Sequence, residues 1–170
     1  MAPTARLLSV ADYLAAETKP ASEYEDSVMT RKPWPTRKHG LIQGWLVELL
    51  RQQSPHLEPG SEITVQIRTG KFMVPDVIAQ RRDAIQDPYP TEPVALCVEI
   101  LSPSDRLSDA LAKCEAYLAW GVPHTWIVDP DQRCAWTCSA GDRLREVPAN
   151  GSLQAQGVAL PLATVFQPLD

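Results

Sequence analysis

The chain has 170 residues, with 16 Lys and Arg against 21 Asp and Glu, which gives a formal net charge of −5. Hydrophobic residues make up 44% and charged residues 22%, a composition that excludes wholesale disorder. The acidic excess argues against a protein that coats nucleic acid through bulk positive charge. The length suits one domain spanning residues 1–170. No apolar run approaches the roughly 18 residues of a membrane span and no signal peptide is evident, so we expect a cytoplasmic protein.

Charges of opposite sign are segregated along the chain. Residues 28–47 hold four basic and no acidic side chains, and residues 63–82 hold four basic side chains and one acidic. Residues 83–131 reverse this balance, with nine acidic side chains against two basic ones. Blocks of this kind are most often solvated surface. They also fit a basic rim beside an acidic centre that attracts a metal ion.

Two helices are predicted in the first third of the chain. Ser9 and Asp12 have the spacing of a capping box for a short helix over residues 9–17. Residues 18–37 contain three prolines, so we expect loop or edge strand there. Apolar residues then recur at helical spacing from Arg37 to Gln53, which predicts a long amphipathic helix.

The pattern next changes to β structure. Apolar and polar residues alternate over residues 63–67, which predicts a strand with one solvated face. Thr69-Gly70-Lys71 reads as a hairpin turn into a second strand over residues 72–79. Residues 94–98 are almost continuously apolar, as expected of a central strand covered on both faces.

A strand–helix–strand unit follows. Residues 105–120 show helical periodicity and end at Gly121, a favourable residue just beyond a helix. Residues 125–128 form another short apolar strand and residues 133–139 alternate again. A strand, a crossover helix and a further strand are typical of a parallel βαβ unit, so we predict one α/β domain.

Two carboxylates stand where the pattern calls for apolar residues. Asp76 lies inside the predicted strand 72–79, and Glu99 lies at the end of the most apolar strand. Burying a carboxylate is costly unless a cation accompanies it, so the two suggest a shared metal ion. Mg²⁺ fits, because it prefers oxygen ligands and is usually held by one or two carboxylates. Lys113, on the helix after Glu99, would position water or stabilise phosphate charge.

Each of these residues also has a structural explanation. A buried carboxylate more often caps a turn or pairs with an arginine, and a lysine beside an apolar helix face usually extends to water. Only the combination of Asp76, Glu99 and Lys113 points to chemistry.

The same residues carry a resemblance to a known family. The matching segments are Val74–Val77, Val98–Ser104, Lys113 with Tyr117, Gly121–Val122 and Trp126–Pro130. In order and spacing they resemble the bacterial Uma-type family of restriction-endonuclease-like proteins, part of the PD-(D/E)XK nuclease superfamily. The resemblance implies an α/β fold with a central mixed β-sheet flanked by helices.

The resemblance also implies Mg²⁺-dependent hydrolysis of DNA by Asp76, Glu99 and a lysine. The usual superfamily lysine lies two residues after the glutamate, where this chain has Leu101, and Lys113 on the next helix takes its place. Family members carry a further glutamate near the N-terminus, which makes Glu25 a third candidate metal ligand. The glycine and second glutamate that follow it in the family are absent here.

The leading hypothesis is therefore a Mg²⁺-dependent endonuclease that acts on DNA, with a homodimer expected for cutting both strands. The alternative is a catalytically inactive module of the same fold that binds DNA or protein. A third possibility is a purely structural homodimer, which exposed apolar area on the tail at residues 159–166 would favour.

Other residues carry weaker indications. The four cysteines have no zinc-site spacing and are expected to be free thiols. His39 is interpreted as a half-exposed structural histidine or as a contact to a loop or phosphate. Trp34, in a basic and proline-rich segment, would stack on a base or a partner if it is not part of the core.

Overall fold

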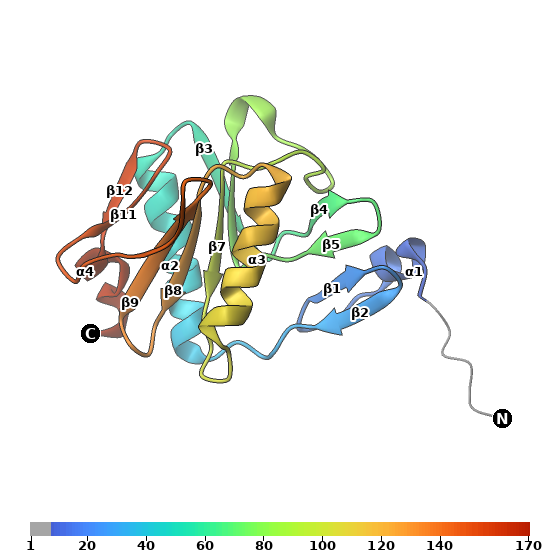
Figure 1. The fold of residues 1–170 in the computed structure, drawn as a ribbon, viewed down its shortest axis with the longest axis horizontal. Coiled ribbons are helices and arrows are strands. Elements are labelled where there is room, and N and C mark those ends of the chain that lie inside the picture. Colours follow the sequence, from blue (N-terminus) through green and yellow to red (C-terminus); the bar gives the residue numbers. More distant parts are fainter. Residues whose placement is uncertain (1–7) are drawn as a thin grey trace.

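The central element of the computed structural model, which describes residues 8–170, is a six-stranded sheet with the strand order β10-β9-β8-β7-β6-β3 (Figure 1). Its strands are β3 (Leu57–Ser61), β6 (Val77–Arg81), β7 (Leu96–Ile100), β8 (Thr125–Asp129), β9 (Cys134–Ser139) and β10 (Asp142–Glu146). The β7 and β8 strands are parallel and the other neighbours are antiparallel. The sheet is therefore mixed, as the predicted fold class requires.

Helix α3 (Leu107–Trp120) links the two parallel strands and covers one face of the sheet. It ends at Gly121, whose φ of 119° places the residue in the left-handed region. The Gly121 N–H donates to the carbonyls of Tyr117 and Leu118, which satisfies groups left free at the helix end. The predicted β–α–β unit is confirmed.

Helix α2 (Arg37–Gln53) covers the opposite face (Figure 1). Its start is capped by the Thr36 hydroxyl, which accepts from the His39 N–H at 3.2 Å. Ile42, Leu46 and Leu50 recur on one side and are buried against the sheet. Because fully burying such a side chain contributes about 1.5–3 kcal/mol, this stripe fixes the helix to the sheet.

The C-terminal segment packs on the same side as α2. It comprises β11 (Ser152–Ala155), β12 (Val158–Pro161), α4 (Leu162–Val165) and the 3₁₀ turn η2 (Gln167–Leu169). Leu160, Val165 and Phe166 are buried in the core that α2 also joins. The large apolar side chains of this tail at residues 159–166 are therefore buried, and the apolar residues it exposes there are the small ones, Ala159, Pro161 and Ala163.

A second, smaller sheet with the order β2-β1-β5-β4 lies beside the central one. Its strands are β1 (Ser22–Glu25), β2 (Val28–Arg31), β4 (Val65–Arg68) and β5 (Lys71–Met73). Helix α1 (Val10–Ala15) packs on it through Tyr13, whose ring lies 5.1 Å from that of Tyr24. Ser9 and Asp12 form the predicted capping box.

One predicted strand is wrong. Residues 72–79 form two strands that belong to different sheets: β5 ends at Met73 and β6 begins at Val77. Pro75 lies between them, and a proline has no N–H to donate to a strand ladder. Asp76 consequently lies where the chain passes from one sheet to the other, and not in mid-strand as predicted.

Several elements had no counterpart in the predicted order, namely β3, β10, α4 and the 3₁₀ turns η1 (Arg82–Ala84) and η2. The four cysteines are free thiols, as expected. Within residues 8–170, no helix combines the length and apolar character needed to cross a bilayer.

Candidate active site

Asp76 and Glu99 face each other where the pairing of β6 with β7 ends. Val77 is opposite Val98 in this antiparallel ladder, and Asp76 and Glu99 are the next residues along the two segments. The Ile100 N–H donates to Asp76 Oδ2 at 2.6 Å, which holds the Asp76 side chain against the end of β7. Asp76 is 2% exposed and Glu99 is 6% exposed. The structure therefore brings the two predicted carboxylates together in a buried position.

Lys113 reaches this pair from helix α3. Its Nζ lies 3.5 Å from Glu99 Oε2 and 2.9 Å from Oε1 of Glu23 on β1. Tyr117, one turn further along α3, donates its hydroxyl to Glu99 Oε1 at 2.7 Å. Residues four apart on a helix share a face, so α3 presents a cation and a hydroxyl to the same carboxylate.

Lys32 is a member of the site that sequence reasoning missed. It follows β2, and its Nζ donates to Asp76 Oδ1 at 2.7 Å, to the Val74 carbonyl at 2.9 Å and to Glu62 Oε1 at 3.1 Å. These three acceptors match the three N–H groups of an ammonium. Its place in a block of basic residues was the only indication in the sequence.

Helix α2 contributes two further polar side chains. His39 Nε2 lies 3.3 Å from Asp76 Oδ2. Gln43 donates to the Asp76 carbonyl at 2.9 Å and to Glu62 Oε1 at 3.0 Å. His39 is only 5% exposed, so its interpretation as a half-exposed residue is wrong. His39 lies three residues before Ile42, on the buried stripe of the helix. This spacing could have predicted that His39 is buried.

Glu25 does not join the other predicted residues. It is 52% exposed and pairs with Arg68 at 2.9 Å and with Lys71 at 2.8 Å in the smaller sheet. Side chains two residues apart in a strand share a face, so Glu23 projects to the same side of β1 as Glu25. It is Glu23 that reaches Lys113.

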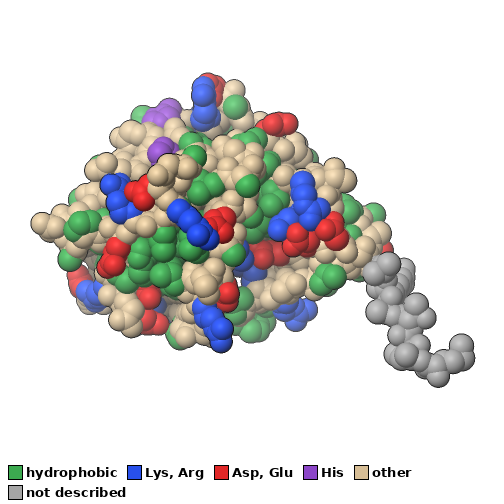
Figure 2. Space-filling model, in the orientation of Figure 1, with side chains coloured by type: hydrophobic (Ala, Val, Ile, Leu, Met, Phe, Trp, Pro, Cys, Tyr) green, Lys and Arg blue, Asp and Glu red, His purple; other side chains and the backbone are tan. Residues whose placement is uncertain are grey.

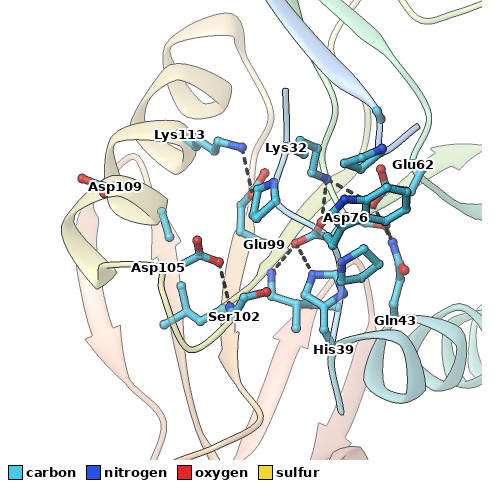
Figure 3. Close-up of a pocket in the computed structure, with 18 of the residues that line it drawn as sticks. Lys32, His39, Gln43, Glu62, Asp76, Glu99, Ser102, Asp105, Asp109 and Lys113 are labelled. Atoms are coloured by element: carbon cyan, nitrogen blue, oxygen red, sulfur yellow. Dashed lines mark hydrogen bonds and ion pairs between the residues drawn. The ribbon is translucent and has the colours of Figure 1, made fainter. Parts of the chain in front are cut away.

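A pocket of about 470 Å³ lies at the centre of the site (Figure 3). Its polar lining includes Lys32, His39, Gln43, Glu62, Asp76, Glu99 and Lys113. Figure 3 shows Lys32, His39 and Gln43 on one side and Lys113 with Asp109 on the other, with Asp76 and Glu99 between them. The loop after β7 closes one end, where the Ser102 N–H donates to Asp105 Oδ2 at 2.7 Å. Residues 18–21 and 32–35 complete the wall.

The two central carboxylates differ in their affinity for protons. Burial acts to raise the pKa of Asp76, but hydrogen bonding from His39 and the charge of Lys32 hold this pKa well below its usual range. Burial raises the pKa of Glu99 to about 7, because Lys113 only partly offsets the loss of solvation and the charge of Asp76 adds to it. Asp76 is therefore ionised at neutral pH, whereas Glu99 binds a proton readily until a further cation is supplied.

Both lysines stay charged. Burial acts to lower the pKa of Lys32, but Asp76, Glu99 and Glu62 together raise it. Burial likewise acts to lower the pKa of Lys113, but Glu99 and Glu23 raise this pKa above the ordinary value.

The donor set fits a hard divalent cation. Four carboxylates (Glu23, Glu62, Asp76 and Glu99) converge on the ammonium groups of Lys32 and Lys113, so this cluster holds more acidic than basic side chains. Within residues 8–170, no three or more His, Cys, Asp or Glu side chains are arranged as a complete metal-binding group. Asp76 and Glu99 would thus act as a two-carboxylate set, which Mg²⁺ commonly completes with water and substrate phosphate.

A mixed sheet between two helices, with two carboxylates where neighbouring strands meet and a lysine from the crossover helix, matches the restriction-endonuclease-like fold that the resemblance implies. The chain belongs to the Uma2 family, described as "Putative restriction endonuclease", whose model matches residues 10–167. This confirms the resemblance seen in the sequence.

A solved structure supports the same fold. It is a crystal structure from Anabaena variabilis ATCC 29413, described as a putative nuclease belonging to DUF820. It matches with a TM-score of 0.83 and 20% sequence identity over 95% of this chain and 99% of that one. No curated protein matches the chain.

Proposed function

We propose that this protein is a Mg²⁺-dependent endonuclease that hydrolyses phosphodiester bonds of DNA. The observation that carries the proposal is the meeting of two buried carboxylates, Asp76 and Glu99, with the Lys113 ammonium in one pocket. Membership of a family described as "Putative restriction endonuclease" supports the reaction class.

Asp76 and Glu99 would hold the metal ion, which when bound lowers the pKa of water and neutralises phosphate charge. Asp76 is oriented for this by the Ile100 N–H, which donates to its Oδ2 at 2.6 Å, and by His39. Tyr117 fixes one oxygen of Glu99 and leaves the other facing Lys113. The Lys113 ammonium would stabilise the charge that develops on the phosphate.

Cleavage of labelled DNA with Mg²⁺, and with EDTA in its place, tests the proposal. The parent is expected to cut only with Mg²⁺, and Asp76→Asn and Glu99→Gln are expected to abolish cutting. Lys113→Met is expected to slow it by about 10²–10³-fold, the usual effect of removing one group that stabilises developing charge. Glu25→Gln is the matched control, because this carboxylate is paired elsewhere, and should cut as the parent does. Full activity in Asp76→Asn or Glu99→Gln would refute the assignment.

The alternative, an inactive module that binds DNA or protein, is favoured by one observation. The Lys32 ammonium already occupies Asp76 Oδ1 at 2.7 Å, so Asp76 has a cation without any metal. Calorimetric titration with MgCl₂ separates the two functions. Saturable binding that is lost in Asp76→Asn supports the nuclease, and the absence of saturable binding supports the module.

Assembly is part of the proposal. A homodimer would place two sites about a two-fold axis, which suits cutting both strands of a duplex. Sedimentation equilibrium of the parent measures this directly. A monomer would instead indicate that strands are cut one at a time.

A further inference from the structure

Trp34 is an exposed indole at the edge of the active-site pocket. It lines the pocket and is 71% exposed, whereas the other four tryptophans are buried or half-buried. A large apolar side chain held in water forgoes the free energy that burial would contribute. Its position beside the paired carboxylates therefore calls for a ligand that covers it.

The segment that carries Trp34 is held rigidly. Pro33 and Pro35 flank the indole, and each proline ring restricts φ to about −65°. Lys32 fixes one end of the segment to Asp76 at 2.7 Å, and Thr36 caps helix α2 at the other end. Little backbone conformational entropy is lost when such a segment binds a ligand, so the segment is suited to a stacking platform.

One unpaired basic side chain lines the same pocket, and three others are close in sequence to residues that line it. Eleven of the fifteen Lys and Arg residues within 8–170 take part in ion pairs. The remaining four form none within this described part of the chain, and all are exposed: Lys19, Arg31, Arg37 and Arg106. Lys19 lines the pocket, and each of the others lies within two residues of one that does.

The face of the protein drawn in Figure 2 is not uniformly basic. On the face drawn in Figure 2, basic and acidic side chains lie side by side. The pocket of about 470 Å³ falls within the range that encloses one small molecule, so it suits a single nucleotide. Bases in a duplex are already stacked on each other, and only an unpaired base can present its face to an indole.

We infer that the pocket takes a nucleic acid strand with an unpaired base, which stacks on Trp34 while the backbone contacts Lys19, Arg31, Arg37 and Arg106. The inference rests on the proposed function and adds the substrate class, single-stranded or locally melted nucleic acid. Stacking on Trp34 would place the phosphate next to that base beside Asp76 and Glu99.

Binding of fluorescent oligothymidylate in EDTA tests the inference without cleavage. Trp34→Ala is expected to weaken binding by about 10–100-fold, the range for loss of one stacked base, and Trp34→Phe to restore most of it. Ile85→Ala is the control, since Ile85 is also an exposed apolar side chain but does not line the pocket. It should bind as the parent does.

An abasic oligomer of equal length separates stacking from phosphate contacts. The parent should bind it more weakly than oligothymidylate, whereas Trp34→Ala should bind both alike. A paired duplex should bind more weakly than the single strand and be insensitive to Trp34→Ala. Equal binding of oligothymidylate by the parent and Trp34→Ala overturns the inference. A loss of duplex affinity in Trp34→Ala as large as its loss of oligothymidylate affinity overturns it as well.

The outcomes also separate this inference from the proposed nuclease. If Trp34→Ala loses binding but no protein cuts DNA with Mg²⁺, stacking stands and the nuclease assignment fails. If cutting requires Asp76 and Glu99 but Trp34→Ala binds normally, the nuclease stands and the stacking inference fails. If Trp34→Ala changes the sedimentation of the protein and leaves oligothymidylate binding intact, Trp34 is a protein contact and the inference is wrong.

Discussion

Replacing Glu99 by glutamine is expected to stabilise the metal-free protein while abolishing its activity. Glutamine has the same shape and can still accept the Tyr117 hydroxyl, which donates at 2.7 Å to Glu99 Oε1. It removes a buried negative charge whose pKa is raised to about 7 from an ordinary 4.5. The ionised Glu99 carboxylate therefore lowers the stability of the folded protein.

The size of the gain follows from the pKa. At 1.36 kcal/mol per pKa unit, the difference between 4.5 and about 7 corresponds to roughly 3 kcal/mol at a pH above both values. We expect about 1–3 kcal/mol, because Lys113 loses part of its pairing in the variant. A raised pKa means that the folded state retains the proton, so the parent loses stability as pH rises from about 4.5 to 7. The advantage of Glu99→Gln is therefore absent near pH 4 and complete above about pH 7.

Asp76→Asn is the matched variant, and it is expected to lower the stability of the metal-free protein. Burial acts to raise the pKa of Asp76, but hydrogen bonding from His39 and the charge of Lys32 hold this pKa below its usual range. Its ionised form stabilises the fold above the ordinary pKa of 3.8, and this contribution is lost as pH falls. Asparagine leaves the buried Lys32 with Glu62 as its one direct ion-pair partner within residues 8–170, and with the more distant charge of Glu99. The expected loss at pH 8 is about 2–4 kcal/mol, somewhat less than for breaking an isolated buried pair.

Urea denaturation in EDTA, followed by tryptophan fluorescence at pH 4, 6 and 8, measures both effects. Added Mg²⁺ should stabilise the parent and leave Glu99→Gln unchanged, since a ligand that binds only the folded state raises its stability. A loss of stability in Glu99→Gln at pH 8 equal to that in Asp76→Asn would refute the reasoning. It would mean that Lys113 and Tyr117 fully compensate the buried charge.

Two further predictions concern cations of the site. Lys32→Met should destabilise the metal-free protein by about 3–5 kcal/mol, because buried carboxylates lose their cation. The same variant should need less Mg²⁺ than the parent for half-maximal stabilisation in a thermal melt, and an unchanged midpoint would show that Lys32 does not compete with the metal. Replacing Arg31 or Arg37 by alanine should each reduce the slope of log affinity against log salt for oligothymidylate by about 0.7, the value for one phosphate contact on a single strand. Arg143→Ala, which removes a cation paired with Glu115 elsewhere on the surface, should leave that slope unchanged.

Features encoded by short stretches of sequence were predictable. The apolar stripe of α2 and the strand–helix–strand unit around α3 follow local periodicity, and the structure has both. Asp76 and Glu99 were found because each interrupts an apolar pattern. The same reasoning misplaced Asp76 in mid-strand, because it treated Pro75 as part of a continuous strand.

Features that depend on distant contacts were not predictable. Lys32 and Glu62 are thirty residues apart, and only the placement of the smaller sheet beside the central one brings the Lys32 ammonium to both Glu62 and Asp76. Glu25 was chosen over Glu23 by resemblance alone. The periodicity places both glutamates on one face of β1, and it gives no information about which of them α3 approaches.

Net charge was a poor guide because most charges in this chain act locally. The basic residues of 63–82 are used in ion pairs, as Arg68 and Lys71 are with Glu25, so this block does not supply a free basic rim. The block at 28–47 behaves differently: Lys32 enters the site, and Arg31 and Arg37 form no ion pair within residues 8–170. Within residues 8–170, the basic side chains without an ion pair therefore all lie in segments beside the acidic pocket. That arrangement would draw a phosphate backbone to the place where the excess carboxylates would hold a metal ion.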